Sequence, residues 1–154
     1  MRRSEVSAHD KRTTSGVEIG GWLLKANPDV WDVIGHLAAG RAIDGWGVAE
    51  GYRADLMAPG DRCFVWVTGP RGASWTPGIW AAGVVTARPS PTRERRRLRV
   101  GLDVRPLDPV VPRSELRSDP RFAAAEVLRV PRMGNPLILT PTEVAAVDDH
   151  LTQA

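Results

Sequence analysis

Tryptophan is the residue type in this sequence best suited to holding a flat ligand. Six of the nine aromatic residues are Trp, and the other three are Tyr52, Phe64 and Phe122. Each tryptophan has a large flat ring and an N–H that needs a partner, so six of them fit a compact core, an aromatic pocket or both. Trp46 is followed directly by Gly47, which has no side chain and lets another group approach closely. These two residues are therefore our first candidates for a pocket wall.

A second candidate, Trp66, lies in the most strand-like segment of the chain. Residues 63–68 read Cys-Phe-Val-Trp-Val-Thr. Strand alternation places Phe64, Trp66 and Thr68 on one face and three small residues on the other. The small face suits a core, whereas the aromatic face either forms a second core layer or lines a pocket.

Positive charge is carried almost entirely by arginine. The formal net charge is +3, the pI is about 9.7, and only Lys11 and Lys25 among the 21 basic residues are lysines. One stretch is dense in arginine and contains a single acid, Glu94. Such a cluster can bind nucleic-acid phosphate, and it can equally be the solvated tip of a hairpin. The stretch contains Arg88, Arg93, Arg95, Arg96, Arg97 and Arg99.

Enzymatic chemistry has little support in the residues. The sequence contains no nucleophile elbow, phosphate-binding loop, HExxH motif or histidine-centred triad. Its single cysteine, Cys63, lies in hydrophobic sequence without a histidine nearby, which indicates a buried structural thiol and excludes a disulfide framework. The three histidines lack metal-ligand spacing. We therefore expect no catalytic residues, no metal and no cofactor.

The overall composition is that of an ordinary soluble domain. With 154 residues, 42% of them hydrophobic, one domain is favoured over two. Residues 1–18 are charged and rich in Ser and Thr, which predicts a disordered leader before a domain over residues 19–154. No segment has the apolar core of a signal peptide or the length of a membrane span, so we expect a cytoplasmic protein without a membrane partner.

Strands and helices can be placed around the candidate residues. Asn27 and Pro28 have the pattern of a helix N-cap followed by Pro at the first helical position, and Gly40 is a typical helix stop. Thr140 and Glu143 form a capping box for a final helix. Short helical turns are expected at 52–57 and within 112–122, and loops at 69–77 and 88–96. Strands are expected at 22–25, 46–48, 63–68, 78–85 and 97–104.

This order of elements does not alternate between strands and helices as a doubly wound fold does. It predicts an α+β fold, in which a mixed, mostly antiparallel sheet curls into a small barrel flanked by short helices.

Several segments, in order, resemble the EVE domain, a member of the PUA-like superfamily that is similar to the YTH readers of methylated adenine in RNA. The resemblance covers roughly residues 20–151, and no single segment is diagnostic by itself. It implies a pseudo-barrel that holds a flipped, often modified nucleobase in an aromatic cage. The segments are Gly21–Pro28, Trp46–Val48, Met57–Trp66, Pro77–Val85, Val110–Arg117 and Gly134–Pro136.

The resemblance also implies which residues form the pocket. Many EVE domains have serine where this chain has Ala26, and the Arg-Asn pair of their second segment is missing here. The second cage tryptophan of YTH domains has no counterpart, because residues 86–99 contain no aromatic side chain. The implied nucleobase-binding residues are Lys25, Ala26, Asn27, Trp46, Gly47, Val48, Trp66 and Asn135. The arginines at 88, 93, 95, 96 and 97 are the expected phosphate contacts.

Not every tryptophan is assigned to the pocket. Trp22 and Trp31 are expected in the core, whereas Trp75 and Trp80 either cover the pocket or pack on the barrel. Asn27 is explained by helix capping as well as by base contact.

The implied function is a non-catalytic module that captures a flipped, modified base. Methylated or hydroxymethylated cytosine and methylated adenine are the candidate bases, and DNA is favoured over RNA. Because the domain has no nuclease or motor, it acts through an effector protein or serves only to occupy sites.

Two alternatives stay open. An ASCH-like hydrolase of acylated nucleosides would need a pocket lysine, for which Lys25 qualifies, and an acid beside it, for which Glu50 is the only candidate near a pocket strand. The same fold also serves as an RNA-binding module.

Overall fold

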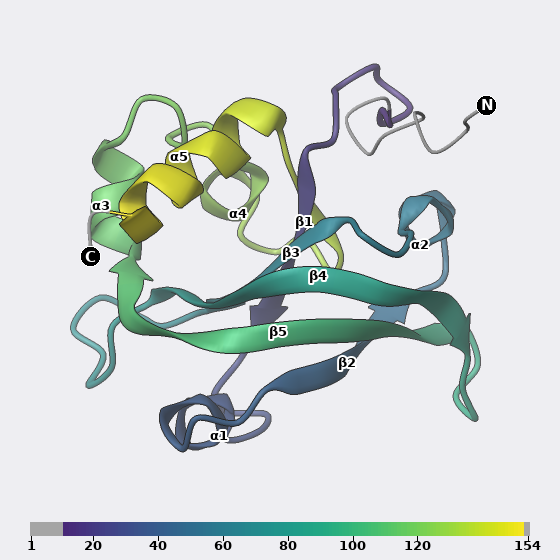
Figure 1. Cartoon of the computed structure of the whole chain (residues 1–154), viewed down its shortest axis with the longest axis horizontal. Coiled ribbons are helices and arrows are strands. Elements are labelled where there is room, and N and C mark those ends of the chain that lie inside the picture. The colour runs from purple at the N-terminus through teal and green to yellow at the C-terminus, as the bar shows by residue number, and fades with distance from the viewer. Residues whose placement is uncertain (1–10, 153–154) are drawn as a thin grey trace.

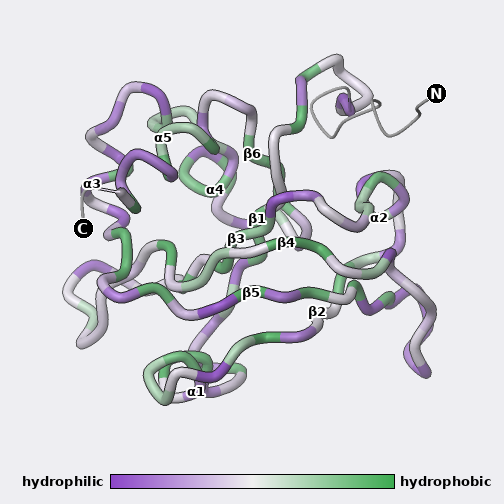
Figure 2. Tube along the Cα trace, viewed as in Figure 1, coloured by the Kyte–Doolittle hydropathy of each residue, from purple (hydrophilic) through white to green (hydrophobic). Residues whose placement is uncertain are grey.

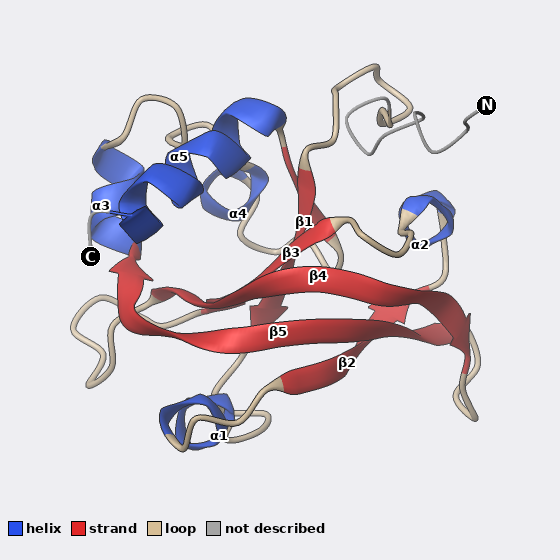
Figure 3. Cartoon of the chain, viewed as in Figure 1, coloured by secondary structure: helices blue, strands red, loops and turns tan. Residues whose placement is uncertain are grey.

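A single six-stranded sheet organises the protein, whose computed structural model describes residues 11–152 (Figure 1, Figure 3). The strand order is β2-β5-β4-β3-β1-β6, and every neighbouring pair is antiparallel except β1 and β3. The strands are β1 (Gly21–Ala26), β2 (Ile43–Ala49), β3 (Arg62–Val67), β4 (Gly78–Pro91), β5 (Arg97–Pro112) and β6 (Leu137–Leu139). The helices are α1 (Val33–Ala38), α2 (Tyr52–Leu56), α3 (Arg113–Ser118), α4 (Glu126–Arg129) and α5 (Pro141–Thr152).

The predicted α+β class, with a mostly antiparallel sheet and short flanking helices, is confirmed. The sheet does not close into a barrel through strand pairing, because β2 and β6 remain its two edges within residues 11–152. One backbone hydrogen bond links the end of β2 to the turn before β6, from the Ala49 N–H to the Asn135 carbonyl oxygen, at 3.4 Å. We did not predict β6, because a three-residue apolar run is too short to show a strand period.

Hydrophobic residues pack on both faces of the sheet. Strand β3 alternates as predicted: Val65 joins the core that also contains Trp22, whereas Phe64 and Trp66 join a second core beneath α3, α4 and α5. The aromatic face of β3 is therefore a core layer. In Figure 1 these three helices gather over one side of the sheet, away from α1 and β2.

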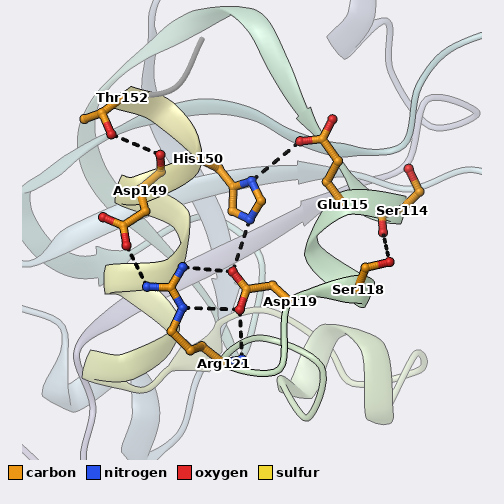
Figure 4. A network of polar contacts seen from close by, with 8 residues as sticks. All are labelled: Ser114, Glu115, Ser118, Asp119, Arg121, Asp149, His150 and Thr152. Carbon is orange, nitrogen blue, oxygen red and sulfur yellow. Dashed lines mark hydrogen bonds and ion pairs between the residues drawn. The ribbon is translucent and has the colours of Figure 1, made fainter.

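A polar network ties the helices of the second core together (Figure 4). Arg121 donates to both carboxylate oxygens of Asp119, at 3.2 and 2.9 Å, and to Asp149 of α5 at 2.6 Å. The Arg121 guanidinium holds the pKa of Asp119 well below its usual range. His150 of α5 lies between Asp119 and Glu115, with N–O distances of 3.2 and 3.5 Å. The network joins α5 to α3 and the loop after it.

The domain begins earlier than we predicted. Residues 11–18 form a turn closed by a bridge between Arg12 and Glu18, and Lys11 makes an ion pair with the buried Asp61 carboxylate at 2.6 Å. Trp22 donates its indole N–H to the same carboxylate at 2.9 Å. The expected disordered leader over 1–18 is therefore wrong for residues 11–18, and residues 1–10 lie outside the described residues.

Helix α1 starts five residues after the predicted position. Its N-cap is Asp32, whose carboxylate accepts from the Gly35 N–H at 2.9 Å. Asn27 instead closes a turn: its side-chain oxygen accepts from the Asp29 N–H at 2.9 Å, a local bond that Asn makes readily and that competes with helix. The predicted stop is confirmed, since Gly40 follows α1 with a φ of +79°.

The hairpin of β4 and β5 is longer than predicted, so part of the expected basic loop is strand. Strand β4 runs through Pro91, and only residues 92–96 connect it to β5. Register shifts between Val85 and Ser90 interrupt the ladder, and such irregularities tolerate proline, which cannot donate a ladder hydrogen bond. This end of the hairpin is strongly hydrophilic (Figure 2).

Candidate functional site

An open cavity of about 570 Å³ lies between the end of β1 and the edge strand β2. Four segments that are distant in the sequence meet there: the end of β1 and its following turn, β2, the start of β5, and the turn before β6. The lining residues are Lys25, Ala26, Asn27, Val30, Trp31, Gly45, Trp46, Gly47, Arg97, Arg99, Gly134 and Asn135. Six of the eight residues predicted to bind a nucleobase are among them.

Two predicted residues do not line this cavity. Val48 is buried in the core on the inner face of β2. Trp66 is only 3% exposed and stacks on Phe122, with ring centroids 6.3 Å apart and planes at 5°. The prediction that Trp46 and Trp66 face a common cavity is therefore wrong, because the C-terminal helices cover the Trp66 face of the sheet.

Trp31 takes the place that we had expected for Trp66. It is 38% exposed, and its ring meets the Trp46 ring edge to face, at 5.9 Å and 66°. The expectation that Trp31 lies in the core is therefore wrong. With Asp32 as the N-cap, Trp31 precedes the helix and lies on the turn at the cavity mouth.

The remaining tryptophans do not line this cavity. Trp22 is fully buried, as predicted. Trp75 and Trp80 are half-buried against the core and donate their indole N–H groups to the Thr68 and Thr76 carbonyl oxygens, at 2.8 and 2.7 Å. Both therefore pack on the sheet.

Asn135 holds the two walls of the cavity together. Its side-chain oxygen accepts from the Lys25 N–H at 2.7 Å, and its amide nitrogen donates to the Lys25 carbonyl at 3.0 Å. Its own carbonyl accepts from Ala49 on β2. The Asn135 side chain thus uses its oxygen and one of its two N–H groups within the protein, and these contacts position β1 against β2.

Asn27 retains a donor group. Its oxygen is used in the turn to Asp29, whereas its side-chain nitrogen makes no hydrogen bond with any residue in the described range 11–152. That nitrogen belongs to a cavity-lining residue whose side chain is fixed by the turn.

The backbone of β2 presents further hydrogen-bonding groups. Backbone groups of alternate strand residues point to the same edge. Since the Ala49 N–H points away from β5 to Asn135, the N–H and C=O of Gly47 also point to that edge. No strand occupies this side of β2 in the described part of the chain. Gly47 therefore offers a donor and an acceptor at the cavity wall.

Two arginines of β5 reach the cavity across glycine. A Cβ at Gly45 would overlap the Arg99 guanidinium, and a Cβ at Gly47 would lie 3.6 Å from Arg97 Nε. Gly45 thus leaves space for the Arg99 side chain, whereas a Cβ at Gly47 would only make an ordinary contact with Arg97. Arg99 also pairs with Asp44 at 3.0 Å.

The other arginines of the basic run lie elsewhere. Arg88 donates to the Met57 carbonyl at 3.4 Å, and Arg93, Arg95 and Arg96 are exposed at the hairpin tip. Of the five arginines predicted to contact phosphate, only Arg97 lines the cavity, and Arg99 joins it.

Lys25 supplies a further cation at the cavity. Its ammonium donates to the Pro131 carbonyl at 2.6 Å, and partial burial lowers its pKa. Glu50, the acid that a hydrolase would need beside it, lines a different cavity on the other side of the Gly134–Asn135 turn. The structure therefore does not assemble the Lys25 and Glu50 pair in one cavity.

The single cysteine and the metal-binding residue types do not add a second reactive site in the described residues. Burial raises the pKa of the Cys63 thiol to about 12, as expected for a structural thiol in the core. Across residues 11–152, no three His, Cys, Asp or Glu side chains gather in a way that could hold a metal ion. No helix in that range is both long and apolar enough to cross a membrane.

The family model of the EVE domain matches residues 21–144. The chain belongs to the EVE domain family. Domains of this PUA-like group generally bind nucleic acid and are typically binding modules. No curated protein matches the chain significantly.

Solved structures share the fold of this EVE domain at low sequence identity. Rpa0253 from Rhodopseudomonas palustris is 20% identical, with 88% of this chain and 94% of that chain covered, and the TM-score is 0.62. A hypothetical protein from Leishmania major is also 20% identical, with 88% and 96% covered and a TM-score of 0.59. The DUF55 domain of human thymocyte nuclear protein 1 is 17% identical, with 82% and 95% covered and a TM-score of 0.56.

Proposed function

We propose that this EVE domain captures a flipped, modified nucleobase without catalysing a reaction, in DNA more than in RNA. The observation that carries the proposal is the open aromatic corner made by Trp31 and Trp46. Hydrogen-bonding groups and the cationic side chains of Lys25, Arg97 and Arg99 line the same cavity. Aromatic rings bind the faces of bases, polar groups bind their edges, and cations bind the phosphates of the nucleic-acid backbone.

The angle between the two rings decides how a base can sit. At 66° and 5.9 Å, the rings cannot both stack on one flat base. A base that stacks on Trp46, which is anchored in β2, directs its edge or a methyl group at Trp31. The site is thus an aromatic corner, in contrast to a sandwich of two parallel rings.

The edge of the base meets groups that distinguish it from other flat molecules. Gly47 supplies a backbone donor and acceptor, and the Asn27 side-chain nitrogen supplies a second donor. Burial of a methyl carbon adds only about 0.8 kcal/mol to the binding free energy. A preference of more than tenfold for a methylated base therefore has to come from these polar groups.

Phosphate contacts provide the remaining affinity. Stacking contributes about 1–3 kcal/mol per base, and extracting a base from a duplex costs a few kcal/mol, so the two nearly cancel. Lys25, Arg97 and Arg99 line the same cavity, so they are our candidates to bind the phosphates that flank a captured nucleotide. Each phosphate contact also makes the affinity depend on salt concentration.

Titration of oligonucleotides tests the proposal. DNA and RNA strands that carry 5-methylcytosine, 5-hydroxymethylcytosine or 6-methyladenine are compared with unmodified strands by fluorescence anisotropy. We expect at least one modified DNA to bind more tightly than its unmodified form, and Trp46→Ala to weaken that binding. Equal affinity for all strands, with no effect of Trp46→Ala, would overturn it. Tighter binding of modified RNA than of the same DNA would instead identify an RNA-binding module.

A further inference from the structure

Exposed apolar side chains concentrate around the nucleobase cavity and one neighbour of it. Four large hydrophobic side chains are exposed within residues 11–152, and Val30, Trp31 and Tyr52 are three of them. Val30 and Trp31 line the first cavity, and Tyr52, which is 41% exposed, lines the second. Tyr52 is an exposed aromatic ring at a cavity that adjoins the first one, so the second cavity is a candidate site for a second flat group.

The second cavity begins where β2 ends. Its volume is about 320 Å³. Its lining includes Ala49 and Glu50 at the end of β2, Tyr52 of α2, and Met133 and Asn135 of the loop before β6. The turn that contains Asn135 is the only wall that the two cavities share, and Asn135 bonds to Ala49 across it. The two cavities are therefore adjacent along β2, and only that turn separates them.

The tip of the basic hairpin lies next to the second cavity. Arg97 and Arg99 line the first, and the Arg96 carbonyl accepts a hydrogen bond from the Glu50 N–H of the second, at 3.0 Å. That bond places the arginine-bearing tip of the hairpin beside the second cavity. A nucleic-acid strand has a phosphate between successive nucleosides, so this arrangement fits a strand better than a single nucleotide.

We propose that the second cavity binds the nucleobase adjacent to the captured one. Tyr52 stacks on that base, and the Glu50 carboxylate accepts a hydrogen bond from its exocyclic amino group, which cytosine and adenine have and thymine lacks. This proposal rests on the proposed function, because it extends the same ligand by one nucleotide. It makes the domain a reader of a modified base together with one flanking base.

Strands with an abasic neighbour test the second cavity. Short single-stranded DNA is used that carries 5-methylcytosine, 5-hydroxymethylcytosine or 6-methyladenine, with an intact or an abasic nucleotide on the 5′ or the 3′ side. For the wild-type full chain, we expect an abasic nucleotide on one side to weaken binding about fivefold or more, and on the other side to have little effect. Indifference to both abasic positions would overturn the proposal.

Variants at Tyr52 and Glu50 assign that effect to the second cavity. Tyr52→Ala should bind strands with an intact or abasic neighbour equally, whereas Tyr52→Phe keeps the ring and should behave as the wild type. Glu50→Gln should lose the preference for cytosine or adenine over thymine as the neighbour. Because Glu50 is exposed, this variant tests the proposal even if circular dichroism shows that Tyr52→Ala is unfolded. Unchanged dependence on the neighbouring base in folded Tyr52→Ala, or an unchanged preference for cytosine or adenine as the neighbour in Glu50→Gln, would overturn the assignment.

If the first cavity does not bind a modified base, these experiments give a different result. In that case no modified strand binds more tightly than its unmodified form, whatever its neighbour, and Trp46→Ala has no effect. That result would overturn both proposals, whereas modification-dependent binding without neighbour dependence would overturn only the second.

Discussion

Trp46 and Trp66 have similar local surroundings, but only Trp46 is accessible to a ligand. Each lies in a strand and has an aromatic neighbour about 6 Å away, Trp31 at 5.9 Å and Phe122 at 6.3 Å. Trp66 is buried beneath the C-terminal helices, whereas Trp46 lies on the edge strand β2. The helices that cover the ring, and not the residue type, therefore decide that Trp66 belongs to the core and that Trp46 lines the cavity.

The angle between the ring planes also distinguishes the two aromatic pairs. The Trp66 and Phe122 planes are almost parallel, at 5°, and both rings are buried in the second core, where a ligand cannot reach them. The Trp31 and Trp46 planes meet at 66° and leave an open corner. The comparison predicts that substitutions in the first pair reduce stability and that substitutions in the second pair reduce binding.

The largest expected effect is on stability, at Trp66. Trp66→Ala leaves a cavity between the sheet and the C-terminal helices and should lower the free energy of unfolding by about 3–5 kcal/mol. Urea denaturation followed by circular dichroism measures the loss. Trp31→Ala, at an exposed ring, is the matched control and should cost much less. Equal losses in the two variants would contradict the distinction between covered and open rings.

The open region depends on polar contacts, and Asn135 tests this dependence. Asn135→Ala leaves the N–H and carbonyl of Lys25 without their side-chain partner, which should cost about 1–3 kcal/mol of stability. It should also weaken binding of modified DNA, because β1 and β2 are no longer held at a fixed separation. Asn27→Ala removes only the local bond to Asp29 and is the control for stability. Binding that survives Asn135→Ala unchanged would show that the cavity does not need this contact.

The two rings of the corner should contribute unequally to binding. Trp46→Ala removes the stacking surface and should weaken binding of modified DNA by about 1–3 kcal/mol. Trp31→Ala removes a contact with the edge of the base, and should reduce the preference for a methylated base by at most about 0.8 kcal/mol. Anisotropy titrations of methylated and unmethylated strands separate the two quantities. A greater loss of total affinity in Trp31→Ala would reverse the assignment of the stacking ring.

Local patterns in the sequence predicted several elements correctly. The alternation of residues 63–68 placed Phe64 and Trp66 together on one face, as observed. The predicted capping box also forms: the Thr140 N–H donates to Glu143 at 2.9 Å, and the Glu143 N–H donates to the Thr140 hydroxyl at 3.2 Å. Both features depend only on residues close in the sequence.

Features that depend on distant parts of the chain could not be predicted this way. Whether Trp66 is core or pocket is decided by helices at residues 113–152, and the exposure of Trp31 by a helix start five residues later than expected. Asn135 and Lys25 are 110 residues apart, and nothing local to either shows that they bond. The family resemblance pointed to residues 25–27, 46–47 and 134–135 of the cavity lining, but Trp31 and Arg99, and the roles of individual residues, needed the fold.

The smallest expected effect is at the arginines, and it concerns salt dependence. If Arg97 and Arg99 each contact a phosphate, replacement of either by Gln should reduce the slope of log affinity against log salt by about 0.7 for single-stranded DNA. Arg88, which belongs to the same basic run but does not line the cavity, should leave the slope unchanged when replaced by Gln. Equal changes of slope in the three variants would mean that the run acts as a diffuse positive surface. A change confined to Arg97 and Arg99 would mean that phosphate is held at the cavity mouth, beside the same corner that receives the base.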